Sequence, residues 1–368
     1  MALPVIKSII DCSSLEKTVY PYIPQLYDLP QQILQSYNNP TGLKNLYLAT
    51  NPLISAFAFS LFLAPLFLII SEINKNYSQV DRLWSILPTL YNAHYTIYAH
   101  MYGLDTKRLD NMIAFSVVWS LRLTFNYWRK GGYTVGSEDY RWEILRQKIH
   151  PGLFFIFNVL FISLAQSVLL FLITTPTYII LLTGRIGEEL TTADMAFVRL
   201  MMALVLLEFF ADQQQWNYQH AKKEYLKTAR VPRAFHQEDL DRGFVVTGVW
   251  SWSRHPNFAA EQAIWVVLYQ WGCYTSDVLY NWTFIGAMAY LILFQASTWF
   301  TELITAGKYP EYKEYQRRVS KFLPSLYTDL PGDFSDRRSD NAIEAKVDQK
   351  VAERLRKQGA KKNGAVKR

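Results

Sequence analysis

Hydrophobic residues along this chain gather into long runs rather than alternating with polar residues. Seven of these runs are about as long as an α-helix that crosses a bilayer, with allowance for tilt and for interfacial ends. They cover residues 52–71, 82–102, 110–128, 152–174, 195–211, 258–274 and 281–300. The first, fourth and fifth runs are the most uniformly apolar, whereas the second and third also carry ionisable residues. The pattern predicts an all-α, polytopic membrane bundle of about seven transmembrane helices.

The regions outside the seven runs differ from one another in composition. Residues 1–51 contain several prolines and tyrosines, and we expect them to form a lumenal or interfacial lead-in. Residues 52–330 then form the transmembrane domain, and residues 331–368 form a basic, mobile cytosolic tail, because few apolar residues occur there. A short apolar piece, Tyr178–Leu182, is too short to cross the bilayer, and we expect it at the membrane interface.

The connections between the runs differ in their content of lysine and arginine. Residues 129–150 contain five of these basic residues, and residues 212–257 contain seven. By contrast, residues 175–194 contain one and residues 275–280 contain none. Positively charged loops stay in the cytosol. The count therefore predicts that the two basic loops and the C-terminus are cytosolic, and that the N-terminus lies on the other side.

Composition narrows the class of protein further. Half of the chain is hydrophobic and 19% is charged, below the roughly 25% of an average soluble domain. Cys12 and Cys273 are the two cysteines, so neither a disulfide framework nor a four-thiolate metal site is expected. The patterns of a dinucleotide fold, a P-loop and a serine hydrolase do not occur. The net charge is +7, and residues 333–368 hold 11 Lys/Arg against 6 Asp/Glu, which favours a membrane-facing tail over nucleic-acid binding.

Ionisable side chains at the start of the second run are the first candidates for function. A charged group in a membrane helix is costly and usually faces a cavity or a partner. Asp81 opens this run, and Trp84, Pro88 and Tyr91 follow it at helical spacing, so one face is polar and aromatic. This face could contact a substrate. An interfacial anchor is the alternative.

Arg122 lies deeper, about two turns inside the cytosolic end of the third run. A guanidinium at this depth needs an anionic partner, either a carboxylate or a phosphate. Arg129 follows two turns later, and Asp212 and Gln214 stand at the cytosolic end of the fifth run, where they could bind a sugar or an amide. A structural Arg–Asp pair and a helix cap remain the alternatives.

The sharpest pattern is the block GVWSWSRHPNFAAE, which ends at Glu261. Pro256 favours the start of a helix, so Arg254 and His255 stand at a helix N-terminus, where backbone N–H groups attract anions. Asn257 and Glu261 lie one turn apart on the same helical face. A glutamate inside a membrane helix is costly unless it is protonated or paired, which favours a functional role.

Several motifs follow one another along the chain and together resemble a known family. They are Asp81-x-x-Trp84, Trp119-x-x-Arg122-Leu123, Glu138-Asp139-x-Arg141-Trp142, Ala211-Asp212-x-Gln214, the block ending at Glu261, and Tyr312-x-x-Tyr315-Gln316-Arg317-Arg318 with Phe322-x-Pro324. The combination is similar to membrane proteins grouped with the steroid 5α-reductase C-terminal domain, over about residues 78–326. Isoprenylcysteine and phospholipid methyltransferases share a block like Arg254-His255-Pro256-Asn257.

The resemblance implies a seven-span bundle that holds NADPH at its cytosolic side and admits an apolar lipid from the bilayer. Hydride would pass to a C=C bond conjugated to a carbonyl, and a proton donor would polarise that carbonyl. The cofactor-binding residues would be Arg122, Arg129, Asp212, Gln214, Arg254, His255, Asn257 and Glu261. The catalytic candidates are Asp81 and Glu261, and the candidate substrate contacts are Trp84, Tyr91 and Trp119.

The sequence departs from the steroid reductases at positions that matter for chemistry. Where those enzymes carry a carbonyl-polarising glutamate and tyrosine, this chain has Ile86 and Trp119, so the acid would be Asp81 or a neighbouring tyrosine. Ala260 replaces the glycine that usually precedes the family's glutamate. We predict an NADPH-dependent reductase of a lipid double bond in the endoplasmic reticulum membrane. An S-adenosylmethionine-dependent methyltransferase and a non-catalytic lipid-binding protein are the alternatives.

Overall fold

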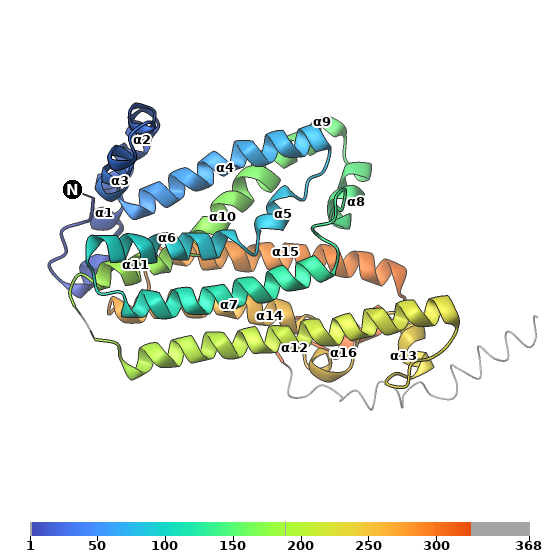
Figure 1. Ribbon diagram of the computed structural model, residues 1–368. Coiled ribbons are helices and arrows are strands. Elements are labelled where there is room, and N and C mark those ends of the chain that lie inside the picture. Colours follow the sequence, from blue (N-terminus) through green and yellow to red (C-terminus); the bar gives the residue numbers. More distant parts are fainter. Residues whose placement is uncertain (1, 188, 325–368) are drawn as a thin grey trace, which may run out of the picture. The chain divides into compact units, whose positions relative to one another are not determined.

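The computed structural model of the chain describes residues 2–187 and 189–324. It is all-helical, with 75% helix and no strand in the described ranges (Figure 1). The predicted tail, residues 331–368, lies outside the described residues. The elements are η1 (Ile9–Ser13), α1 (Leu15–Thr18), η2 (Tyr20–Tyr22), α2 (Ile23–Ser36), α3 (Pro40–Ala49), α4 (Pro52–Asn74), α5 (Gln79–Leu83), α6 (Leu87–Tyr102), α7 (Lys107–Arg129), α8 (Tyr140–Lys148), α9 (Pro151–Phe157), η3 (Asn158–Ala165), α10 (Gln166–Leu172), α11 (Thr175–Thr183), α12 (Thr192–Thr228), α13 (Gln237–Arg242), η4 (Gly248–Ser251), α14 (Pro256–Thr275), α15 (Phe284–Lys308) and α16 (Tyr312–Arg318).

The chain divides into two compact units. The larger unit consists of Met1–Gln213 and Asn257–Lys308, and the smaller unit consists of Gln214–Pro256 and Tyr309–Arg368. The division falls within α12 and at the start of α14. Each unit has its own contacts and is described by itself below.

Within residues 2–187 and 189–324, three helical stretches are long and apolar enough to cross a membrane. They are Pro52–Asn74, Pro151–Thr183 and Phe284–Lys308. The first two contain the first and fourth of the seven predicted runs, and the third contains most of the last. The run 195–211 forms part of α12 but is not among the three. The structure thus supports an apolar helical protein compatible with a membrane.

α11 corrects one expectation from the sequence. The piece Tyr178–Leu182 was expected at the membrane interface, but every residue of α11 is buried. α11 packs against α6 and α7 in the core of the larger unit. The sequence pattern identified an apolar helix too short to span but could not tell the protein interior from the membrane interface, since both accept apolar side chains.

Side-chain hydrogen bonds join α4 to the stretch that runs from α9 to α10. Asn158 donates from Nδ2 to Ser71 Oγ at 3.0 Å and to Glu72 Oε1 at 2.8 Å. Ser167 Oγ donates to the Ser60 carbonyl at 2.7 Å. Asn158 also begins η3, an eight-residue π-helix. Small and polar residues of this kind let apolar helices pack closely where lipid would otherwise compete.

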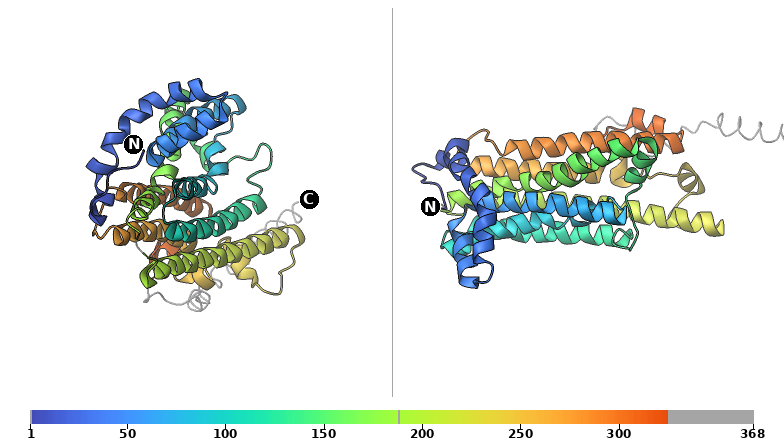
Figure 2. Two further views of the ribbon diagram at one scale, coloured as in Figure 1. Left: turned by 60° about the vertical axis from the view of Figure 1, so that its left-hand side comes forward. Right: turned by 90° about the horizontal axis from the view of Figure 1, so that it is seen from above.

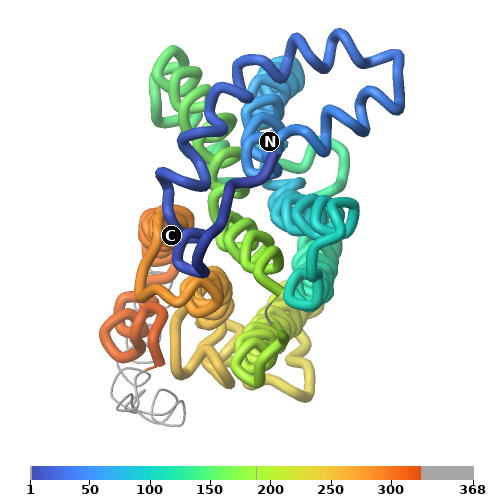
Figure 3. Tube along the Cα trace, turned by 90° about the vertical axis from the view of Figure 1, so that its left-hand side faces the viewer, coloured from blue at the N-terminus to red at the C-terminus, as the bar shows by residue number. Residues whose placement is uncertain are grey.

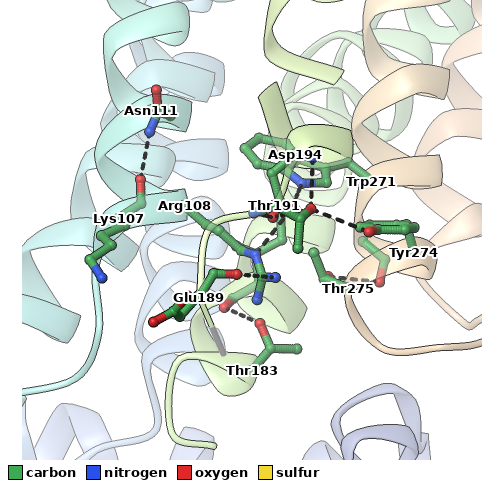
Figure 4. A network of polar contacts seen from close by, with 12 residues as sticks. Lys107, Arg108, Asn111, Thr183, Glu189, Thr191, Asp194, Trp271, Tyr274 and Thr275 are labelled. Carbon is green, nitrogen blue, oxygen red and sulfur yellow. Dashed lines mark hydrogen bonds and ion pairs between the residues drawn. The ribbon is translucent and has the colours of Figure 1, made fainter. Parts of the chain in front are cut away.

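A second polar contact joins α7, α12 and α14 near their ends (Figure 4). Arg108 Nε donates to Asp194 Oδ1 at 3.1 Å, and Trp271 Nε1 donates to the same oxygen at 2.7 Å. Thr191 donates to the other carboxylate oxygen from its backbone N–H and its hydroxyl, each at 2.8 Å. Asp194 is fully buried, and one guanidinium balances its charge.

Residues 2–51 run across one end of the larger unit, where α4 begins (Figures 1 and 3). Tyr178 in α11 donates its hydroxyl to the Thr18 carbonyl at 3.0 Å, and Asn51 donates to that hydroxyl at 2.9 Å. Asn51 also caps α4 by accepting from the Leu53 N–H at 2.9 Å, and Pro52 occupies the first turn. The lead-in is therefore fixed to the bundle at the residue where α4 starts.

The smaller unit is held together by aromatic rings and backbone contacts. Phe244 packs against Tyr309, Tyr312 and Tyr315, with ring centroids between 5.0 and 6.0 Å apart. Tyr315 donates its hydroxyl to the Trp250 carbonyl. α16 is therefore packed against the segment before η4.

The close approach of α15 to α10 yields a stability prediction. A Cβ atom at Gly286 would lie 2.2 Å from the Leu172 carbonyl oxygen, whereas one at Gly307, on the same helix, would meet nothing within 4 Å. We expect Gly286→Ala to destabilise the protein by about 1–3 kcal/mol through overpacking. Gly307→Ala should be neutral or stabilising by up to about 1 kcal/mol, because alanine favours helix. Thermal unfolding of the two purified variants checks this, and equal midpoints would contradict the close packing.

Candidate functional site

Arg122 lies at the centre of the most highly charged buried group in the larger unit. Its Nη1 contacts Asp212 Oδ2 at 2.9 Å, and its Nη2 contacts Glu208 Oε2 at 2.9 Å and Glu261 Oε2 at 3.3 Å. The side chains of all four residues are at most 7% exposed. We call these four residues the Arg122 cluster. The anionic partner that the sequence required for Arg122 is thus a set of three carboxylates from α12 and α14.

Glu261 is the most completely hydrogen-bonded member of the Arg122 cluster. Its Oε1 accepts from Trp265 Nε1 at 2.9 Å and from the Tyr290 hydroxyl at 2.8 Å. Its Oε2 accepts from Trp119 Nε1 at 3.0 Å and from Arg122. Four donors from α7, α14 and α15 therefore fix the orientation of this carboxylate.

The Arg122 cluster brings several carboxyl groups to one guanidinium. Three carboxyl groups contact Arg122, whereas Arg108 contacts the carboxylate of Asp194 and donates to the Glu189 carbonyl. Two buried atoms of the cluster, Arg122 Nε and Glu208 Oε2, also lack a hydrogen bond of good geometry within the described residues. Buried polar atoms without such a bond are uncommon. The cluster thus has unused hydrogen-bonding capacity and an excess of acceptors.

Aromatic rings line the cluster on one side. Trp119 and Trp265 pack edge to face with centroids 5.2 Å apart, and Trp265 lies 6.3 Å from Tyr290. Trp84 stacks on Tyr290 at 6.2 Å and donates to its hydroxyl at 3.4 Å. We call these four rings the aromatic wall. It brings the predicted substrate contacts Trp84 and Trp119 beside the predicted catalytic residue Glu261.

Polar contacts extend the cluster toward the end of α7. Asn257 Nδ2 donates to Asp212 Oδ1 at 3.2 Å. Arg129 donates from Nη1 to Gln213 Oε1 at 2.8 Å and from Nε to Asn126 Oδ1 at 3.0 Å. The predicted cofactor residues Arg122, Asp212, Asn257 and Glu261 are thus together, and Arg129 lies two turns along α7.

Asp81 belongs to a different group of contacts. Its carboxylate accepts from Trp142 Nε1 at 2.9 Å, beside an Asp139–Arg141 pair that is bonded through two N–H groups at 2.9 Å each. Burial lowers the pKa of the Arg141 guanidinium, but the bonds to Asp139 outweigh burial and raise that pKa above its ordinary value. Arg141 also donates to Ser297 in α15. Asp81 thus has a different set of contacts from Glu261, and its catalytic role stays a prediction.

Tyr91 is buried among aromatic side chains. Its ring packs against Phe59 at 6.2 Å and Phe171 at 5.8 Å. Its hydroxyl has no hydrogen-bond partner among the residues that the structure describes. Tyr91 therefore packs in the core between α4, α6 and α10, and its role in substrate binding stays a prediction.

The remaining predicted cofactor residues lie in the smaller unit. Arg254 donates to the Gln316 carbonyl at 3.1 Å and to the Val319 carbonyl. The His255 backbone N–H donates to the Lys321 carbonyl at 3.2 Å, and Gln214 Oε1 accepts from the Val249 N–H at 3.1 Å. These contacts hold α16, the segment after it, and η4. A cofactor-binding role for the three residues stays a prediction.

Sequence reasoning missed two members of the site, Glu208 and Tyr290. Glu208 lies one helical turn before Asp212, inside an apolar run, and an ionisable residue in such a run is a recognisable signal. Tyr290 lies in the last apolar run among other apolar residues, and nothing in its local sequence distinguishes it. Only the packing of α15 on α14 brings its hydroxyl to Glu261.

Comparison with known proteins identifies the family of this chain. Residues 67–319 match the model of the DUF1295 family, which is described as a protein of unknown function. A protein of Schizosaccharomyces pombe, described as uncharacterized protein C594.04c, is 39% identical over 326 residues, which cover 88% of this chain and 93% of that protein. No solved structure matches the chain. The matched region includes the whole Arg122 cluster and the aromatic wall, and the chain belongs to the DUF1295 family.

Proposed function

We propose that the protein is a membrane-embedded reductase that uses NADPH to reduce a carbon–carbon double bond in a lipid. The observation that carries this proposal is the Arg122 cluster, a buried group of acceptors beside the aromatic wall. The motif resemblance to the steroid 5α-reductase group supports the same class of reaction. Apolar helices around the cluster suit a lipid substrate.

The nicotinamide end of the cofactor fits the cluster better than the phosphate end does. A carboxamide and ribose hydroxyls offer N–H and O–H donors, and the carboxyl groups of Glu208 and Asp212 offer acceptors. A flat aromatic ring also suits the aromatic wall. Phosphate oxygens are acceptors and would meet further acceptors at the cluster, which disfavours them. We therefore assign Arg122 the role of holding the carboxylates in position rather than binding phosphate.

Basic residues at the end of α7 are better placed for the phosphates. Arg129 shares hydrogen bonds with Asn126 and Gln213, and the Lys130 side chain is exposed. Guanidinium and ammonium groups are the usual partners of phosphate oxygens. By their place in the shared motif, Arg254 and His255 belong to the same role.

The proton donor in this proposal is Tyr290 rather than Asp81. Bound NADPH would supply a hydride to the double bond. Tyr290 brings a buried hydroxyl to Glu261, and Trp119, at the position of the steroid reductases' tyrosine, donates to the same carboxylate. Glu261 accepts from the Tyr290 hydroxyl and so orients the phenol.

The carboxyl groups beside the aromatic wall also suit a second candidate, an S-adenosylmethionine-dependent methyltransferase. A sulfonium group is a cation, and carboxylates beside tryptophan and tyrosine rings attract cations. The block around Arg254-His255-Pro256-Asn257 has counterparts in membrane methyltransferases. The two candidates differ in the ligand that the cluster accepts, so a binding measurement separates them.

The proposal includes a location and an orientation. We propose seven spans in the endoplasmic reticulum membrane, formed by α4, α6, α7, the stretch Pro151–Thr183, α12, α14 and α15. The loops 129–150 and 212–257 and the C-terminal tail would face the cytosol, because they carry most of the basic residues.

The first prediction concerns the ligand. Mass spectrometry of small molecules released from purified protein should detect NADP(H), and NADPH should raise the unfolding temperature more than NADH or S-adenosylmethionine does. Arg129→Ala should weaken NADPH binding by at least about 1.5 kcal/mol, the lower end for a lost charge-assisted hydrogen bond. A thermal shift with S-adenosylmethionine alone would favour the methyltransferase. No shift with any of these ligands would favour a non-catalytic protein.

The second prediction concerns the number of carboxyl groups in the Arg122 cluster. Glu208→Gln removes one of three carboxylates with little change in shape, so the ligand-free protein should be as stable as the wild type or more stable. The NADPH-induced thermal shift should nevertheless shrink, because an acceptor is lost. Asp194→Asn is the contrasting variant. It breaks the buried ion pair with Arg108 and should lower the free energy of unfolding by about 3–5 kcal/mol. If Glu208→Gln destabilised the protein and left the shift unchanged, the carboxylate would be structural only.

The third prediction concerns orientation. Val135 and Leu279 are highly exposed and lie in loops 129–150 and 275–280. In sealed vesicles with the cytosolic side outward, a membrane-impermeant maleimide should label Val135→Cys directly. Leu279→Cys should react only after permeabilisation. The reverse pattern would invert the orientation, and equal labelling of both would contradict an odd number of spans between them.

A further inference from the structure

α2 exposes much of its apolar side, which is unusual for a helix at the edge of a folded unit. Tyr27 is 77% exposed, Leu34 is 71% exposed and Tyr37, which directly follows the helix, is 65% exposed. These residues recur at the spacing of one helical face. We define the apolar face of α2 as Ile23, Tyr27, Ile33, Leu34 and Tyr37, all of which are exposed.

The other sides of α2 have identifiable surroundings. Gln25 Oε1 accepts from the Asn51 N–H at 2.8 Å, and Leu29 is 8% exposed, so this side contacts the protein. Asp28, Gln31, Gln32 and Gln35 form a polar side that is exposed. The apolar face of α2 therefore points away from the bundle and is separate from the polar side. Its exposed apolar side chains require an apolar environment outside the described protein.

The position of α2 identifies that surrounding. α3 follows it and is joined to α4 by two residues, Thr50 and Asn51, and α4 is one of the three stretches that can cross a membrane. α2 and α3 run crosswise to α4 at its first turn (Figures 1 and 2). Helices that lie across the end of a membrane span are at the level of the lipid headgroups.

The charge of this segment indicates which lipids it meets. Residues 18–43 contain no lysine or arginine, and Asp28 is the single acidic residue. Most helices that bind anionic membranes carry basic residues on the polar side. Tyrosine, by contrast, is enriched at membrane interfaces because one end of its ring is apolar and the other is polar. The surface therefore suits the interface of neutral, zwitterionic lipids.

We propose that the apolar face of α2 docks into the headgroup region of the bilayer that α4 crosses, on the leaflet opposite the basic loops. This inference rests on the proposed membrane placement. Gln25 and Asn51 fix the depth of α2 relative to the first turn of α4. The docked helix anchors residues 2–51 as a collar on that leaflet, through apolar burial rather than charge.

Depth-dependent fluorescence quenching tests the inference on the full chain in phosphatidylcholine nanodiscs. Single cysteines for a polarity-sensitive fluorophore replace Leu34 on the apolar face, Gln32 on the polar side, or Phe62 in the middle of α4, in a background with Cys12→Ser and Cys273→Ser. We expect a lipid with a nitroxide near its headgroup to quench the Leu34→Cys label several-fold more than the Gln32→Cys label. A water-soluble quencher should show the reverse order. Adding phosphatidylserine should leave both ratios unchanged.

Each other quenching result contradicts either the membrane placement of α4 or the docking of α2. If the Phe62→Cys label is not reached by a lipid with a nitroxide deep in its chain, the membrane placement itself is wrong. If Phe62→Cys is reached but the Leu34→Cys label is quenched from water as strongly as Gln32→Cys, α2 is solvated and the inference fails alone. If Leu34→Cys is protected from both quenchers, protein covers the face, either a second copy or a partner, and the inference also fails.

Discussion

The Arg122 guanidinium and its three carboxyl partners are polar groups kept away from water, and helices of the larger unit meet around them. An unpaired buried charge costs several kcal/mol, so the four groups must stay in contact whenever the unit is folded. α7 supplies the guanidinium, α12 supplies Glu208 and Asp212, and α14 supplies Glu261. Tyr290 and Trp84 attach α15 and the segment before α6 to the same point. The positions of these helices around the site are thus set by one electrostatic requirement.

Much of this arrangement was predictable from the sequence, and the rest depends on contacts between distant segments. Arg122 and Glu261 stand out because an ionisable residue in an apolar run requires a partner, and the structure pairs them with each other. Spacing along one helix, however, shows which residues share a face and not which helix that face meets. Asp81 and Trp84 were placed together on one polar face, yet Asp81 bonds to Trp142 in α8 and Trp84 bonds to Tyr290 in α15. The same limit explains the misplacement of α11, whose composition suits a core and an interface equally.

The Arg108–Asp194 pair and the Arg122 cluster differ in the ligands that they could bind. Arg108 and Asp194 form an ion pair whose hydrogen bonds lie within the fold, which is typical of a structural pair. The Arg122 cluster leaves acceptors in excess, and excess acceptors bind donors and cations rather than anions. An arginine in a predicted cofactor site is usually taken as a phosphate ligand. In our proposal, the carboxyl partners of Arg122 favour the uncharged or cationic end of a ligand instead.

The two arginines of α7 have a mechanical consequence when they are considered together. Arg108 and Arg122 are 14 residues apart, and their partners Asp194 and Glu208 on α12 are also 14 residues apart. At 1.5 Å per residue the two ion pairs are separated by about 21 Å on both helices, which run in the same direction. Sliding α12 along α7 by a single turn would break both pairs at once. The two ion pairs therefore oppose sliding of α12 along α7. In any rearrangement around the site, these two helices would move together, and other helices would move relative to them.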